Sequence, residues 1–179
     1  MTTNEISTII INNLCERQFP IYLTTYFGQG MNEADVFAVN KNGYMYEYEI
    51  KRSLSDYYAD FKNKTYKHGM LKSRDAVQIY DERVKGKRTG NTYESISIPN
   101  RFYYVCEDGL ISIGDIPEYA GLLYIRDGKL VEQKSAPMLH KNKANERVYA
   151  RISTMLSERI IYGCSYRTHK QKSKLGLKD

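Results

Sequence analysis

Residues 33–51 read EADVFAVNKNGYMYEYEIK, two runs of branched and aromatic residues on either side of a polar turn that ends in Gly43. Residues of these types favour β-strands, and a glycine-bearing turn between two such runs predicts a β-hairpin. Successive side chains of a strand alternate between the two faces of a sheet, so the register of the hairpin decides which side chains meet. The length of the turn therefore determines which polar residues share a face.

Two turn lengths fit this hairpin. A two-residue turn, Asn42-Gly43, sets Asp35 opposite Ile50. A three-residue turn over 41–43, with glycine in the left-handed conformation, sets Asp35 opposite Glu49. In this second register one face carries Asp35, Glu47, Glu49 and Lys51, and the opposite face, expected to be core, carries Ala34, Val36, Ala38, Tyr46, Tyr48 and Ile50.

Two carboxylates and a lysine on one face of a hairpin suit phosphodiester chemistry. Asp35 and Glu49 supply the oxygen ligands that a hard cation such as Mg²⁺ takes while it retains several waters. Lys51 can stabilise charge on phosphate oxygens or orient an attacking water. The trio predicts a metal-dependent phosphodiesterase site, with Glu47 as either an additional acid or a solvent-facing residue. The alternative is an exposed hairpin whose Glu and Lys side chains form ordinary cross-strand pairs.

An acid followed by Glu-x-Lys on the next strand resembles the PD-(D/E)xK nucleases, the superfamily of type II restriction enzymes and Holliday-junction resolvases. The motif residues here are Asp35, Glu49 and Lys51, and Ala34 replaces the proline that often precedes the first acid. The run 49–53 with the residues that follow resembles the branch of MmcB-type DNA-repair proteins; these residues are Asp56, Tyr57, Asp60, Phe61, Lys62, Lys67 and His68. The resemblance covers residues 33–70.

The resemblance implies an α/β fold with a restriction-endonuclease-like core, in which a central mixed β-sheet is flanked by helices. It also implies a deoxyribonuclease that depends on Mg²⁺ or Mn²⁺, with metal bound by Asp35, Glu49 and the Ile50 carbonyl and with Lys51 as the charge-stabilising catalytic residue. DNA is the expected partner, RNA stays open as a substrate, and a homodimer is compatible because cutting two strands needs two sites. A noncatalytic nucleic-acid-binding protein of the same fold, acting in DNA repair or replication, is the alternative, and a scaffold protein is a third reading.

Basic side chains are unevenly distributed along the chain, which has 27 Lys and Arg, 21 Asp and Glu, and a formal net charge of +6. Clustered lysine and arginine side chains favour contact with phosphate backbones. The expected nucleic-acid-binding residues are Arg52, Lys62, Lys64, Lys67, Lys85, Lys87 and Arg88. The basic tail, 164–179, is either a phosphate-binding arm or a solvated terminus.

Length and composition predict one domain over residues 1–163, followed by that tail. No stretch approaches the ~18 continuous apolar residues of a membrane span, and we expect neither a membrane partner nor a signal peptide. Three cysteines, Cys15, Cys106 and Cys164, are odd in number and far apart. They argue against a disulfide framework or a structural zinc site and fit a reducing, cytoplasmic location.

Hydrophobic periodicity predicts the remaining elements. Helices are expected over 4–17, 53–68 and 144–162, and strands over 22–27, 101–106, 122–126 and 129–133, with a basic loop over 84–98. In the second helix the apolar stripe of Leu54, Tyr57, Tyr58, Phe61 and Thr65 is expected to face the sheet and to leave Lys62, Lys64 and Lys67 more exposed. Glu5 and Glu16 on the first helix are candidates for an additional acid, with a solvent-facing role as the alternative.

Overall fold

A computed structural model describes residues 1–15, 18–22, 34–73 and 98–162, and within them a six-stranded mixed sheet in which strands neighbour one another in chain order. The strands are β1 (Gln18–Tyr22), β2 (Val36–Asn40), β3 (Met45–Ile50), β4 (Arg101–Glu107), β5 (Ala120–Arg126) and β6 (Lys129–Lys134). β3, β4 and β5 run parallel, and the other neighbouring pairs are antiparallel. The expected α/β class with a central mixed sheet is confirmed.

The chain divides into two units, Met1–Ala144 and Asn145–Asp179, and each is described by itself. The second contains α5 (Glu146–Tyr162), where a helix was expected over 144–162. The expected domain over 1–163 extends across this boundary, and the tail over 164–179 lies outside the described residues. No helix in the described part of the chain has the length and apolar character needed to cross a membrane.

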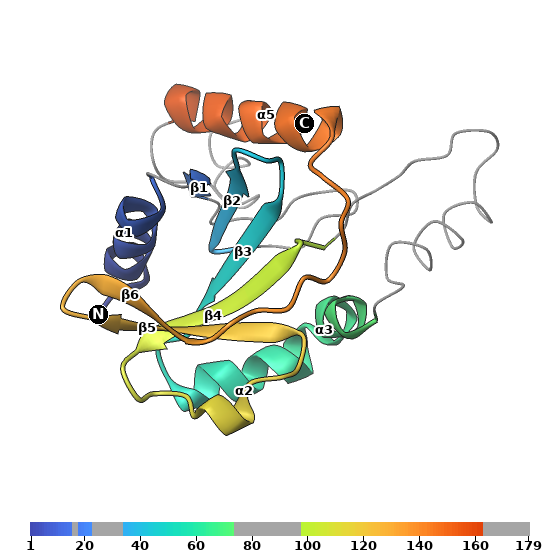
Figure 1. The fold of residues 1–179 in the computed structure, drawn as a ribbon. Coiled ribbons are helices and arrows are strands. Elements are labelled where there is room, and N and C mark those ends of the chain that lie inside the picture. The colour runs from blue at the N-terminus through green and yellow to red at the C-terminus, as the bar shows by residue number, and fades with distance from the viewer. Residues whose placement is uncertain (16–17, 23–33, 74–97, 163–179) are drawn as a thin grey trace. The chain divides into compact units, whose positions relative to one another are not determined.

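Helices cover both faces of the sheet in the first unit (Figure 1). On one face α1 (Thr3–Leu14) packs Ile6 and Ile10 against the side chains that the hairpin register predicts to be core, including Val36, Tyr48 and Ile50. On the other face lie α2 (Leu54–Asn63) and α3 (Thr65–Lys72). Their core residues Tyr57, Met70 and Leu71 share a cluster with Phe102 and Tyr104 of β4. Burial on two faces explains why the central strands are rich in apolar residues.

The turn between β2 and β3 has the longer of the two expected forms. Gly43 has a φ of +84°, its N–H donates to the Asn40 carbonyl at 2.8 Å, and the Asn40 N–H donates to the Tyr44 carbonyl at 2.9 Å. The Asn40 side-chain oxygen also accepts from the N–H groups of Asn42 and Tyr44, both at 3.0 Å. This is a three-residue loop with glycine in the left-handed region. It pairs Val36 with Tyr48 and so confirms the second register.

Helix α1 begins with a capping box. Glu5 N–H donates to Thr2 Oγ1 at 3.3 Å, and the Glu5 carboxylate accepts from Thr2 N–H at 2.6 Å. Such reciprocal bonds satisfy two of the amides left free at a helix start. Of the two candidate acids on the first helix, Glu5 therefore caps the N-terminus of α1, and Glu16 lies outside the described residues.

Two local expectations were wrong. The helix expected over 53–68 is two helices that break at Lys64. Leu54 and Tyr58 are exposed, because the face of α2 that meets the sheet carries Tyr57 and Asp60 instead. A strand is present at Gln18–Tyr22, while 23–27 of the strand expected from residue 22, like 84–97 of the expected basic loop, lies outside the described residues.

Substitution of Gly121 tests how closely β5 packs against Tyr103 and Ala136. A Cβ at this position would lie 2.6 Å from the Ala136 backbone nitrogen and would overlap the Tyr103 ring. We expect Gly121→Ala to lower the free energy of unfolding by about 3 kcal/mol, measured by urea denaturation of the full chain. Gly69→Ala is the control, because its Cβ meets nothing within 4 Å. It should raise stability by about 0.5–1 kcal/mol, the usual gain for alanine within a helix. A stable Gly121→Ala variant would contradict this packing.

Candidate functional site

The hairpin register brings Asp35 beside Glu49. Val36 of β2 pairs with Tyr48 of β3. Asp35, which precedes Val36, therefore lies opposite Glu49, which follows Tyr48. The Asp35 Oδ2 accepts the N–H of Ile50 at 2.8 Å, which holds the carboxylate against the end of β3. The predicted meeting of the two motif acids is therefore present.

The polar face of β3 is buried beneath α2 and α3. Glu47, Glu49 and Lys51 are 4%, 3% and 3% exposed. A solvent-facing Glu47 and an exposed hairpin, both open alternatives from sequence, are thus wrong, because the crossover between β3 and β4 places two helices over this face. Buried charges are costly unless they are paired, so their partners determine what this face can do.

Glu49 is held by three lysines. Its Oε1 lies 3.1 Å from Lys51 Nζ and 2.5 Å from Lys64 Nζ, and its Oε2 lies 2.7 Å from Lys67 Nζ. Lys67 Nζ also lies 2.5 Å from Glu47 Oε1. Lys67 therefore bridges the two buried glutamates of β3 from the first turn of α3.

Asp60 of α2 joins the same network from the opposite side. Its Oδ1 lies 3.0 Å from Lys51 Nζ and 3.1 Å from Lys64 Nζ, while its Oδ2 lies 3.0 Å from His68 Nε2. Lys51 and Lys64 are thus shared between Glu49 and Asp60. The sequence reading did not assign Asp60 or His68 to the site. Asp60 lies in α2, Lys64 at the break between the two helices, and Lys67 and His68 in α3, so the single helix expected over 53–68 does not predict that these four side chains meet.

Burial and paired charge move the pKa values of these acids in opposite directions. Burial and the neighbouring Glu49 raise the pKa of Asp35 to about 6, against the Ile50 N–H, which favours the anion. Burial raises the pKa of Glu47 to about 7 although Lys67 opposes it. Burial also disfavours the Glu49 anion, but the charges of Lys67, Lys51 and Lys64 together outweigh it and lower its pKa to about 2. The lysines therefore stabilise the Glu49 anion, whereas the surroundings of Asp35 disfavour its negative charge.

A pocket of ≈ 260 Å³ opens onto this network. Asp35, Glu49, Ile50 and Lys51 line it from the hairpin side, and Asp60 and Lys64 line it from the helices. Every motif residue named from sequence therefore faces one small polar cavity. Clustered acids with displaced pKa values in a cavity are typical of functional sites, although structural ion-pair networks also show them.

The expected nucleic-acid-binding residues separate into distinct environments. Arg52 and Lys62 are exposed and follow or precede the pocket-lining residues Lys51 and Asn63 in the chain, and Lys64, which lines the pocket, is 31% exposed. Lys67 is 3% exposed, so the expectation that it faces solvent is wrong, because two buried glutamates hold its ammonium group inside. Lys85, Lys87 and Arg88 lie outside the described residues.

The pocket offers oxygen ligands, the atom type that a hard divalent cation prefers. The motif carboxylates Asp35 and Glu49 line it with Ile50, as do the carboxylates of Asp56 and Asp60, and Mg²⁺ commonly takes only one or two carboxylates with waters. Both Glu49 oxygens also contact lysine ammonium groups, so a cation would share this carboxylate with the lysines. Among the described residues no cluster of three or more His, Cys, Asp or Glu side chains is arranged to hold a metal. The main chain and water would have to complete the ligand set.

Comparison with known proteins yields a fold and no family. No family model and no curated protein matches the sequence. The solved structure of a protein of unknown function, SPO1766 from Silicibacter pomeroyi, superposes with a TM-score of 0.58 at 14% sequence identity. The match covers 94% of this chain and 97% of that chain. At this identity the similarity shows a shared α/β fold alone.

The raised pKa of Asp35 predicts how stability depends on pH. The folded state favours the protonated carboxyl, so the contribution of this group is full below pH ~4 and is lost as pH rises through about 6. Asp35→Asn mimics the neutral acid. In chelator-containing buffer we expect it to be more stable than the wild type by about 1–2 kcal/mol at pH 8 and equal to it near pH 4, as measured by urea denaturation.

Asp56→Asn is the matched control, since Asp56 lines the same pocket but is exposed. It should leave the pH dependence unchanged. An Asp35→Asn variant that is less stable than the wild type at pH 8 would contradict the charge imbalance.

The two ion pairs of Lys67 predict a large effect of its removal. Lys67→Met leaves Glu47 and Glu49 buried without this ammonium group, and loss of one partner from a buried pair costs about 3–5 kcal/mol. Chemical denaturation of the full chain measures the loss. Lys62→Met, at an exposed lysine of α2, should change stability by no more than about 0.5 kcal/mol. Equal stability of the two variants would show that Lys67 is not the buried bridge.

Proposed function

We propose that the protein is a Mg²⁺- or Mn²⁺-dependent nuclease that hydrolyses phosphodiester bonds of DNA, with a restriction-endonuclease-like core. The observation that carries the proposal is the convergence of Asp35, Glu49, Ile50 and Lys51 on one pocket, in the register that the Asp…Glu-x-Lys motif requires. The buried, ion-paired setting supports a functional site, because an exposed hairpin with no function has no reason to bury these groups.

Each motif residue has a role that its surroundings support. Asp35 and Glu49 offer carboxylate oxygens, and the Ile50 main chain lies between them at the end of β3. A divalent cation, when bound, lowers the pKa of a coordinated water and polarises the phosphoryl group. Lys51 lies within 3.1 Å of Glu49 and within 3.0 Å of Asp60, which fixes its ammonium group where charge on a phosphate oxygen needs stabilisation.

Lys64 adds a second ammonium group at the pocket edge. It contacts the same two acids as Lys51, yet it is 31% exposed, so a phosphate at the mouth of the pocket can reach it. Arg52 and Lys62 are exposed on adjacent segments and suit contacts with the phosphate backbone. These three basic residues support a nucleic acid as the partner.

The test is cleavage of linear, circular, branched and single-stranded DNA, and of RNA, by the full-length protein with Mg²⁺ or Mn²⁺. We expect metal-dependent cleavage that falls at least ~10³-fold in Asp35→Asn and Lys51→Met, as removal of a principal charge-stabilising group does. Asp127→Asn, at an exposed position outside the pocket, should retain activity. Asp35→Asn is the sharper variant because we expect it to fold at least as stably as the wild type. Every substrate left intact by the wild type would refute catalysis.

One observation favours the second candidate, a noncatalytic nucleic-acid-binding protein of the same fold. The lysines that contact both oxygens of Glu49 form a closed, neutralised network that needs no metal. This candidate predicts salt-sensitive binding of DNA that survives Asp35→Asn and Lys51→Met without any cleavage. Absence of binding at low salt would instead favour a scaffold protein.

A further inference from the structure

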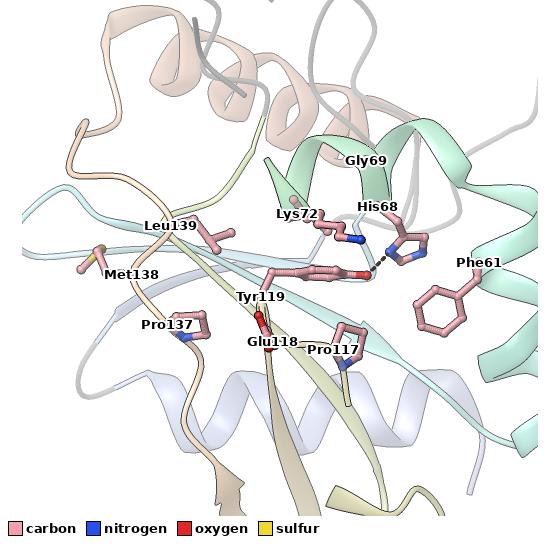
Figure 2. A pocket seen from close by; sticks show the side chains of 11 residues that line it. Phe61, His68, Gly69, Lys72, Pro117, Glu118, Tyr119, Pro137, Met138 and Leu139 are labelled. Atoms are coloured by element: carbon pink, nitrogen blue, oxygen red, sulfur yellow. Dashed lines mark hydrogen bonds between the residues drawn. The ribbon is translucent and has the colours of Figure 1, made fainter. Parts of the chain in front are cut away.

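A chain of polar contacts leads from Lys51 away from the pocket to Tyr119. Lys51 Nζ lies 3.0 Å from Asp60 Oδ1, Asp60 Oδ2 lies 3.0 Å from His68 Nε2, and His68 Nδ1 lies 2.9 Å from the Tyr119 hydroxyl. Figure 2 shows the last of these contacts, with the Tyr119 ring directed at the imidazole from the segment before β5. Residues from four segments thus meet in this network: the end of β3, α2, α3 and the segment before β5.

Asp60 is held at both of its oxygens. Oδ1 faces the ammonium groups of Lys51 and Lys64, and Oδ2 faces the His68 ring. A carboxylate fixed in this way cannot rotate without losing contacts on one side. His68 is itself fixed by Tyr119 and by the Phe61 ring, whose centroid lies 4.6 Å from that of the imidazole.

We propose that Asp60, His68 and Tyr119 are positioning residues of the candidate site. They hold the ammonium groups of Lys51 and Lys64 at the pocket, and they share these charges so that Glu49 is not the sole acceptor of both lysines. The inference rests on the proposed function and deepens it, because it names what orients the catalytic lysine. Partners of this kind, one contact removed from the reacting groups, typically change metal affinity or activity 10–100-fold when they are removed.

The geometry also assigns the tautomer of His68. Burial opposes ionisation of Asp60, but the hydrogen bond from His68 and the charges of Lys51 and Lys64 hold its pKa well below the usual range. An anionic carboxylate only accepts, so His68 Nε2 carries the proton and donates it to Asp60. Nδ1 then accepts from the Tyr119 hydroxyl. His68 and Tyr119 also line a second pocket of ≈ 950 Å³, together with Glu118 and Lys72.

The test compares His68→Ala, His68→Gln and Tyr119→Phe in the full-length protein. Nitrogen NMR of the labelled imidazole should show the Nε2–H tautomer in the wild type. The ammonium protons of Lys51 and Lys64 should be protected from exchange in the wild type and unprotected in His68→Ala. His68→Gln, whose amide N–H can still donate to Asp60, should restore protection. Tyr124→Phe is the control for Tyr119→Phe, since the Tyr124 hydroxyl donates to the Ile111 carbonyl outside the chain of contacts.

Function is measured in parallel by Mn²⁺ titration and by cleavage. His68→Ala should weaken Mn²⁺ binding about tenfold and lower kcat more than it raises KM, with recovery to within about threefold in His68→Gln. If the wild type neither binds Mn²⁺ nor cleaves, the proposed function fails, and the NMR readouts still decide the positioning role. An Nδ1–H tautomer, or lysine protection that His68→Ala leaves unchanged, would overturn it.

Discussion

The buried anion of Glu49 is the constraint on which this region of the protein depends. A carboxylate that is 3% exposed on a central strand stays ionised only when positive charges pair with it. The ammonium groups of Lys51, Lys64 and Lys67 form these pairs with the two Glu49 oxygens. Lys64 and Lys67 reach the sheet only because they lie at the break between α2 and α3 and in the turn after it. The charge at the end of β3 and the path of the chain above it are therefore parts of one arrangement.

Burial and the lysine charges together give the four acids different pKa values. Glu49 and Asp60 are stabilised as anions by their lysines, whereas burial leaves Asp35 and Glu47 with pKa values of about 6 and about 7. Replacing a buried ion-pair network by apolar residues is often neutral or stabilising, so stability alone gives little reason for this one. Its opening into a pocket lined by motif residues supports the proposed function.

The similarity to a solved structure supports the fold and not the proposed function. The match to SPO1766 extends over nearly the whole of both chains, yet at 14% identity it carries no activity from one protein to the other. The same α/β architecture supports many unrelated functions, and a function must be argued from the geometry of its site. Here the argument rests on the register of one hairpin and on the partners of its polar face.

The sequence alone determined the mixed α/β class, most strand positions and the hairpin, because strand alternation and turn chemistry are local properties of residues 33–51. It also offered the register in which Asp35, Glu49 and Lys51 are neighbours as one of two, and the loop ending in Gly43 has the length that this register needs. Only the tertiary structure decided that Lys67 is buried, that Asp60 and His68 belong to the network, and that Leu54 and Tyr58 face solvent. Helical periodicity predicts that the most hydrophobic face of a helix is buried. A charged face can be buried instead when it pairs with opposite charges on the sheet, and such pairs join residues that are distant in the chain.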